Sequence, residues 1–281
     1  PLVVIHTHPA TLISCTRYMV GELAPHWKSM GIAVVEVPAP VVVPSAAAAL
    51  MHVDATRPLP AYTDLARKYD LALNAGVGSI EKRLISRQLV TRHDGYQGPV
   101  IVKTNLNYGG MVDYRNARCT APWRTLSLAI RERLPWYLRA SIRDKAYRVF
   151  PHPRDVPRCV WYNPSLVVER LLPERDGDAF VIRSWYFFGD QGFVCVNRSS
   201  AAVAHATTIL SRTVEAEPPP ALYRLRDELR FQFGKFDYTI VDGQPCLLDA
   251  NHTPTLGRLP QWPWFHDQMK RLATGIQKFI A

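Results

Sequence analysis

Apolar runs alternate with amphipathic stretches through the first quarter of the chain. The runs PLVVIHT and IAVVEVPAP are rich in β-branched residues, and each predicts a buried strand. Residues 63–69 predict a helix, and residues 46–52 predict a short helix or a strand. A further helix is predicted over residues 16–30, where the apolar side chains recur at helical spacing: Tyr18, Met19, Leu23 and Trp27. Strands alternating with helices predict a parallel α/β layer up to about residue 75.

The remaining pattern predicts two further groups of strands. A helix over residues 80–90 leads to the strand in GPVIVKTNLNYGG, and residues 125–147 predict a helix interrupted at Pro135. The second group comprises SLVVERLLPE, AFVIRSWYFFGDQGFVCVNRSS, FDYTIV and QPCLLDA. The glycines between WYFF and FVCV predict a hairpin. Helices are predicted over residues 221–233 and 264–280.

Composition places the chain among globular proteins. Of its 281 residues, 47% are hydrophobic and 21% are charged, which is unlike a disordered chain. There is no apolar run of the length that a spanning helix needs, and no basic leader, so a cytoplasmic protein is expected. The five cysteines are scattered without CxxC spacing, which argues against a disulfide framework and a structural zinc site.

Charge points to anionic partners. The net charge is +10, and basic residues with interleaved aromatic residues crowd the stretch between Arg115 and Arg158. This stretch is either a solvated helical face or a surface for a polyanion.

Two acidic residues and an amide are candidate metal ligands. The segment FGKFDYTIVDGQPCLLDAN predicts two strands joined by a turn at Asp242-Gly243, which brings Asp237 close to Asp249. Alternation along the strand puts Asp249 and Asn251 on one face. Carboxylate and amide oxygens in this arrangement suit Mg²⁺. Taken alone, Asp-x-Asn before Thr-Pro is also typical of a polar turn.

Three other features are candidate anion or nucleotide contacts. Lys103 ends the apolar strand VIVK before Gly109-Gly110, where backbone N–H groups have room to approach a phosphate. Lys82 begins a helix and is either a second phosphate contact or a surface lysine. The segment VVERLLPE, with Glu169 and Glu174, offers backbone, apolar faces and carboxylates to a nucleotide, although an exposed strand edge would have the same pattern.

Cations inside the predicted strands form a fourth set. An unpaired charge within a strand is costly, and converging cations would stabilise the negative charge that develops in phosphoryl or acyl transfer. The set comprises Arg183, Arg198 and Lys235.

In their order and spacing, these features resemble the ATP-grasp superfamily, over roughly residues 74–257. The motif order resembles the D-alanine–D-alanine ligase and ribosomal-protein glutamate ligase branches. The resemblance implies that Lys82 and Lys103 hold the ATP phosphates and that Arg183 and Arg198 are the family's strand arginines. It implies a nucleotide hinge formed by Glu169, Arg170, Leu171, Leu172 and Glu174, with Glu169 near the adenine and Glu174 as a ribose ligand.

The same resemblance implies a magnesium triad of Asp237, Asp249 and Asn251. Asp249 stands where the family usually has a glutamate. Lys235 stands where the D-alanine–D-alanine ligase branch has an arginine, which keeps the charge but loses the bidentate fork.

The implied fold is a three-lobed ATP-grasp α/β fold with ATP between two α+β lobes. The expected lobes are residues 1–75 (parallel α/β), 76–165 (central, with a basic helical insert at 112–150) and 166–281 (with the metal site). The implied activity is ATP- and Mg²⁺-dependent ligation of a carboxylate to an amine through an acyl-phosphate, with small-molecule or peptide substrates. An ATP-grasp kinase acting on a polyol or sugar, and a non-catalytic polyanion-binding protein, are the alternatives. A nucleic-acid partner is not expected, and an anionic partner at the basic insert is the alternative to a solvated face.

Overall fold

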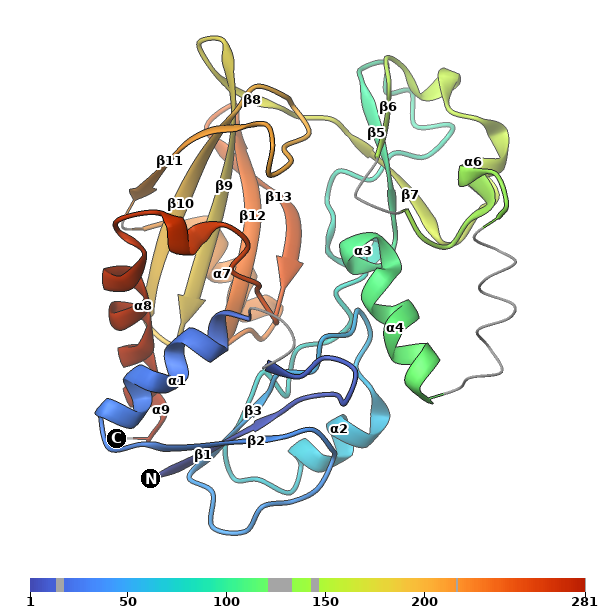
Figure 1. The fold of residues 1–281 in the computed structure, drawn as a ribbon. Coiled ribbons are helices and arrows are strands. Elements are labelled where there is room, and N and C mark those ends of the chain that lie inside the picture. The colour runs from blue at the N-terminus through green and yellow to red at the C-terminus, as the bar shows by residue number, and fades with distance from the viewer. Residues whose placement is uncertain (14–17, 121–132, 143–146, 216, 281) are drawn as a thin grey trace.

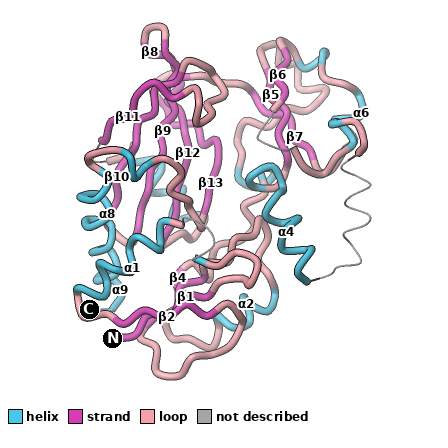
Figure 2. Tube along the Cα trace, in the orientation of Figure 1, coloured by secondary structure: helices cyan, strands magenta, loops and turns pink. Residues whose placement is uncertain are grey.

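The computed structural model describes residues 1–13, 18–120, 133–142, 147–215 and 217–280, which form three sheets (Figures 1 and 2). We call the parts built on them the N-terminal, central and C-terminal lobes. No helix within these ranges is long and apolar enough to cross a membrane.

The N-terminal lobe confirms the predicted parallel layer. Its strands β1 (Leu2–His6), β2 (Ala33–Val37), β3 (Ala48–Met51) and β4 (Ala72–Leu73) run parallel in the order β2-β1-β3-β4. Residues 46–52 therefore contribute a strand. The helices α1 (Met19–Ser29) and α2 (Pro60–Ala66) cover opposite faces, because Leu50 packs in the cluster with α1 and Ala49 packs in the cluster with α2.

The central lobe is a three-stranded antiparallel sheet in the order β6-β5-β7. Its elements are β5 (Val100–Thr104), β6 (Arg148–Phe150), β7 (Leu166–Arg170), α3 (Lys82–Ile85), η2 (Asn107–Gly110), α4 (Met111–Thr120), η3 (Trp136–Leu138), η5 (Pro153–Asp155) and α6 (Arg158–Tyr162). The helix predicted over 80–90 is reduced to α3, because Val90 N–H donates to the Val168 carbonyl and the Gln88 carbonyl accepts from Arg170 N–H. Much of the helix predicted over 125–147 lies outside the described residues, and the described part has only the short turn η3.

The C-terminal lobe carries the largest sheet, in the order β11-β10-β9-β12-β13, with β8 added at β9. Its elements are β8 (Glu174–Asp176), β9 (Ala179–Phe188), β10 (Gln191–Ser199), β11 (Ile209–Glu215), α7 (Pro220–Glu228), β12 (Phe233–Val241), β13 (Gln244–Asn251), η6 (Leu259–Gln261), α8 (Phe265–Ala273), η7 (Thr274–Ile276) and α9 (Gln277–Ile280). Both predicted hairpins, β9–β10 and β12–β13, are confirmed. The strand β11 was not predicted.

The chain passes from the central sheet to the large C-terminal sheet a few residues after the predicted lobe boundary at residue 166. Strand β7 pairs with β5 over its whole length, so residues 166–170 belong to the central sheet. The crossing to the large sheet follows, between Arg170 and Glu174.

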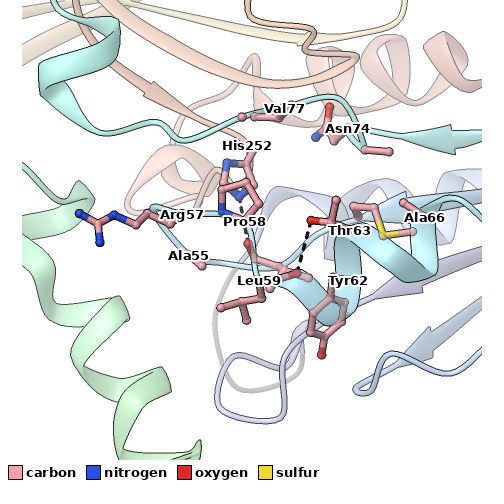
Figure 3. A pocket seen from close by; sticks show the side chains of 14 residues that line it. Ala55, Arg57, Pro58, Leu59, Tyr62, Thr63, Ala66, Asn74, Val77 and His252 are labelled. Carbon is pink, nitrogen blue, oxygen red and sulfur yellow. Dashed lines mark hydrogen bonds between the residues drawn. The ribbon is translucent and has the colours of Figure 1, made fainter.

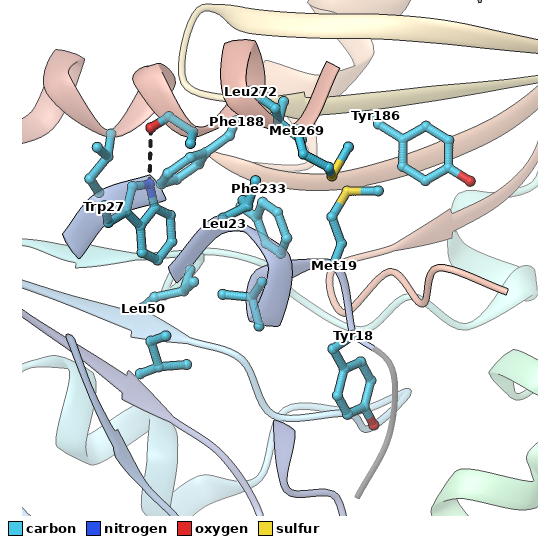
Figure 4. Close-up of a cluster of buried hydrophobic side chains, with 14 of the residues drawn as sticks. Tyr18, Met19, Leu23, Trp27, Leu50, Tyr186, Phe188, Phe233, Met269 and Leu272 are labelled. Carbon is cyan, nitrogen blue, oxygen red and sulfur yellow. Dashed lines mark hydrogen bonds between the residues drawn. The ribbon is translucent and has the colours of Figure 1, made fainter. Parts of the chain in front are cut away.

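One hydrophobic core joins the N-terminal and C-terminal lobes (Figure 4). The predicted stripe of α1 is buried in it, with Trp27 donating from Nε1 to the Ala273 carbonyl at 2.9 Å. Phe188 and Phe233 of the large sheet and Leu272 of α8 pack in the same cluster. The central lobe has a separate hydrophobic core. It therefore packs as one unit against the N-terminal and C-terminal lobes, which share a core.

Candidate functional site

A cavity of about 380 Å³ lies between the central lobe and the large sheet. The central lobe contributes Lys82, Ile101, Lys103, Tyr147 and the crossing residues 170–173. The C-terminal lobe contributes side chains of β9 to β13 and two loops, residues 202–206 and 255–259. This volume is within the range of small-ligand sites.

Lys82 reaches across the cavity from the start of α3. Its side chain is 3% exposed, and Nζ lies 3.0 Å from Oδ1 of Asp249 in β13. Burial opposes the charged lysine, but Asp249, Tyr147 and Glu169 together outweigh it, so the pKa of Lys82 is raised. Lys82 is thus a buried ammonium group whose partner is an acid predicted to bind metal.

Asp237 and Asp249 face each other across the β12–β13 hairpin, as predicted. The register shifts immediately after this pair, so that Leu248 is an extra residue, and both Leu248 and Asp249 line the cavity. Asp237 accepts hydrogen bonds from Ser184 Oγ at 2.6 Å and from Lys235 Nζ at 2.7 Å. The pKa of Lys235 is raised, because Asp237, Tyr186 and Asp249 together outweigh the burial that opposes its charge.

Asn251, the third member of the predicted triad, has a different role in this structure. Its Oδ1 accepts hydrogen bonds from the backbone N–H of Thr253 at 2.8 Å and from the Thr253 hydroxyl at 3.1 Å. It is not among the cavity-lining residues. Asn251 thus forms part of a polar turn in this structure, whereas the two aspartates line the cavity.

Lys103 and Glu169 form a buried ion pair between neighbouring strands. Lys103 Nζ lies 2.7 Å from Glu169 Oε2, and the two side chains are 11% and 4% exposed. The other carboxylate oxygen, Oε1, is buried with no hydrogen-bond partner among the described residues. Lys103 lines the cavity, whereas Glu169 is not among the lining residues, so the pair holds the lysine from behind.

The crossing segment lines the cavity with apolar side chains, whereas Glu174 does not line it. Leu171 and Leu172 face the cavity with Ile101 and Leu248, which together can hold a flat aromatic base. Glu174 instead pairs with Arg183 at 2.8 Å and accepts the Ile240 N–H at 2.7 Å. The expected ribose contact from Glu174 therefore has no support in this arrangement.

Arg183 and Arg198 lie away from the cavity, contrary to expectation. Ser184 and Tyr186 of β9 line the cavity, and alternation turns Arg183 to the other face, where Glu174 and Glu215 bind its guanidinium. On β10, Asn197 lines the cavity, and Arg198 pairs with Asp176. Of the three predicted catalytic cations, only Lys235 lines the cavity.

Arg212 is an arginine of the large sheet that lines the cavity. It lies on β11, donates from Nε to Asn197 Oδ1 at 2.8 Å and stacks over Trp262 with Cζ 5.9 Å from the ring centroid. The signal for it is the sequence ILSRTVE, a short strand pattern with one central arginine. Tyr147 is a second unpredicted lining residue, and burial raises its pKa to about 12, so it remains a hydrogen-bond donor at neutral pH.

Gly109 and Gly110 do not line the cavity. At Gly109, φ is +66°, and an added Cβ would lie 2.2 Å from the Ile142 carbonyl oxygen. Close packing against residues 140–142 thus explains the glycine without a phosphate.

A second, smaller cavity of about 50 Å³ lies beside α2 (Figure 3). His252 of the segment after β13 lines it, with Nε2 2.9 Å from the Val53 carbonyl and Nδ1 buried without a partner among the described residues. Burial lowers the pKa of His252. This histidine joins the N-terminal and C-terminal lobes and is unlike an exposed loop residue.

Magnesium fits the two aspartates when a nucleotide supplies further ligands. Within the described residues, no group of three or more His, Cys, Asp or Glu side chains could hold a metal by itself. Mg²⁺ commonly takes one or two carboxylates together with substrate phosphates and water. Asp237 and Asp249 match that donor set, and Lys82 and Lys235, which now pair with these acids, would then pair with the anionic groups of the substrates.

Comparison with known proteins identifies the fold. No family model matches the sequence, and no curated protein matches it. A RiPP-associated ATP-grasp ligase from Chryseobacterium gregarium, solved with ADP and a leader and core peptide, matches with a TM-score of 0.55 and 9% identity, over 97% of this chain and 95% of that one.

Two further structures match at a TM-score of 0.50 and 12% identity, over 99% of this chain and 100% of each of theirs. They are a RimK domain ATP-grasp protein from Sphaerobacter thermophilus and a D-cycloserine synthetase. The chain has the three-lobed ATP-grasp fold.

Proposed function

We propose that this ATP-grasp chain is an ATP- and Mg²⁺-dependent ligase that joins a carboxylate to an amine through an acyl-phosphate. The observation that carries the proposal is the meeting of Lys82, Lys103 and the Asp237–Asp249 pair in one interlobe cavity. The ATP-grasp ligase and the synthetase with which it shares the fold support the same reaction class.

The nucleotide would lie along the central-lobe side of the cavity. Its base fits among Ile101, Leu171 and Leu248, which line the cavity. Lys82 and Lys103 then meet the phosphates, because both ammonium groups line the same cavity. Mg²⁺, held by Asp237 and Asp249, would neutralise phosphate charge.

The acyl substrate would lie on the C-terminal side, near Arg212 and Lys235. One oxygen of its carboxylate attacks the γ-phosphorus of ATP, and the bond from that phosphorus to the ADP oxygen breaks. The amine then attacks the acyl carbon, phosphate leaves, and the amine proton passes to solvent. Arg212 and Lys235 are the groups that stabilise the negative charge on these oxygens, and positioning supplies most of the rate enhancement.

One of the structures that share this fold suggests which class of substrate the chain takes. The Chryseobacterium gregarium ligase was solved with a leader and core peptide. We propose that the carboxylate or the amine here is likewise part of a peptide. The loop at 202–206 lines the cavity with small side chains, which leaves room for such a substrate.

The test is phosphate release from ATP with a panel of peptide and small-molecule acids, each paired with amines. A ligase releases free phosphate only when acid and amine are both present, and Asp237→Asn and Asp249→Asn each abolish that release. Phosphate transferred to a hydroxyl, as a stable ester, would instead identify a kinase. Full turnover in both variants would overturn the proposed site.

A further inference from the structure

The excess of positive over negative charge lies entirely in the middle third of the chain. Residues 76–165 contain 16 Lys and Arg against 6 Asp and Glu, a net charge of +10, which equals that of the whole chain. Residues 1–75 hold five of each sign and residues 166–281 hold thirteen of each, so both are neutral. An acidic partner is therefore attracted to the central lobe and not to the rest of the molecule.

A groove of about 290 Å³ lies on this lobe. Its floor is aliphatic, formed by Val160, Leu166 and Val168, which belong to the central-lobe core. Its rim carries the exposed side chains of Arg83 and Arg92, and Tyr162 beside them is 76% exposed. None of the described residues that line the groove is acidic.

The groove is separate from the interlobe cavity. None of the described residues lines both, and α6, which ends at Tyr162, lies on the side of the central lobe turned away from the large sheet (Figure 1). Arg83 donates from Nη2 to the Leu166 carbonyl at 2.8 Å, which fixes one cation over the floor. Arg92 Nη1 lies 3.5 Å from the Tyr162 hydroxyl, so the second cation and the aromatic ring stand together at the rim.

We propose that this groove docks an acidic peptide segment of a partner or substrate protein. One apolar side chain of the segment inserts over Val160, Leu166 and Val168, and its flanking carboxylates meet Arg83 and Arg92. A recessed aliphatic floor with a cationic rim fits an apolar side chain between acids. A nucleic-acid strand would instead need several exposed rings along a row of phosphate contacts, whereas Tyr162 is the one large hydrophobic side chain exposed among the described residues that line the groove. The docking requires neither ATP nor the reaction proposed above.

The test is fluorescence anisotropy with a fluorescein-labelled acidic peptide that carries one central leucine, and with its Leu→Ser counterpart. The leucine peptide is expected to bind roughly tenfold more tightly than the serine peptide, because only leucine fills the floor. The double variant Arg92→Glu/Tyr162→Ala should weaken binding of the leucine peptide by about tenfold or more. Circular dichroism and the melting temperature verify that the variant is folded.

The matched control is Arg67→Glu/Val41→Ala, which makes the same charge change and removes an exposed apolar side chain on the N-terminal lobe. It should bind the leucine peptide as the unaltered protein does. Equal affinity for the two peptides, or equal loss in the two double variants, would show general charge attraction and overturn the proposal. So would displacement of the leucine peptide by an oligonucleotide of the same charge but not by unlabelled acidic peptide.

Discussion

Lys82 of the central lobe and Asp249 of the C-terminal lobe form an ion pair across the interlobe cavity, with Nζ and Oδ1 3.0 Å apart. The two residues are 167 positions apart in the chain. Lys82 is a candidate phosphate ligand, and Asp249 is a candidate metal ligand. In this ion pair Lys82 therefore binds the carboxylate that Mg²⁺ would need, and Asp249 binds the ammonium group that a phosphate would need. Binding of ATP with Mg²⁺ would separate them.

Substitution of Asp249 and substitution of Lys82 should lower the free energy of unfolding by different amounts. Asp249→Asn leaves the buried Lys82 ammonium without its counter-charge, which should cost about 3–5 kcal/mol of unfolding free energy. Lys82→Met should cost less, because the Asp249 side chain is 28% exposed and remains hydrated. Urea denaturation of both variants measures the difference. The exposed pair Arg67–Asp64 provides the control, and Arg67→Ala should change stability by less than about 0.5 kcal/mol. Equal losses for Lys82→Met and Asp249→Asn would contradict this account.

Arg212 and Arg198 provide a matched comparison of catalytic importance. They lie on the adjacent strands β11 and β10, but only Arg212 faces the cavity. Arg212→Ala should lower kcat by about 100-fold or more, because the cation that stabilises charge on the transferring group is lost. Arg198→Ala should leave kcat within about twofold, since a surface pair with Asp176 contributes little. Phosphate-release assays on the identified substrates measure both. The reverse order of effects would restore Arg198 as a catalytic residue.

Gly109 should be sensitive to any added side chain. Gly109→Ala places a methyl group against the Ile142 carbonyl in a backbone conformation that favours glycine, and should destabilise the protein by about 2 kcal/mol or more. Gly78→Ala is the control, because no atom lies within 4 Å of its added Cβ and its φ is ordinary. That substitution should be neutral or slightly stabilising. Thermal denaturation distinguishes the two, and a nucleotide-affinity loss in a fully stable Gly109→Ala protein would instead support a phosphate role.

His52 should make the protein sensitive to mild acid. Burial, with a smaller contribution from His252, lowers the pKa of His52 to about 3 from the ordinary 6.5. Between these values the unfolded chain binds the proton and the folded chain does not, so stability falls as the pH falls. The slope from this residue is about 1.4 kcal/mol per pH unit below roughly pH 6.5. Urea denaturation at several pH values should give a flatter profile for His52→Leu, with a remaining slope from His252. An unchanged slope would mean that His52 is protonated in the folded state.

Local pattern was sufficient for the elements whose determinants are close in sequence. The parallel layer, both hairpins and the opposition of Asp237 and Asp249 follow from strand periodicity and turn residues, which act over a few positions. The order of these features along the chain could likewise be read from the sequence: Lys82, Lys103, the crossing segment and the β12–β13 hairpin. Those features led to the ATP-grasp resemblance, and the fold is confirmed.

The choice of which side chains face the cavity depended on tertiary structure. Moving one residue along a strand reverses the face, so that Ser184 faces the cavity while Arg183 is held by Glu174 and Glu215 on the other side. Arg212 lines the cavity because β11 pairs with β10, a contact that no local pattern encodes. Sequence determined the elements and their order, whereas the pairing and packing of distant strands determined which charges meet in one cavity.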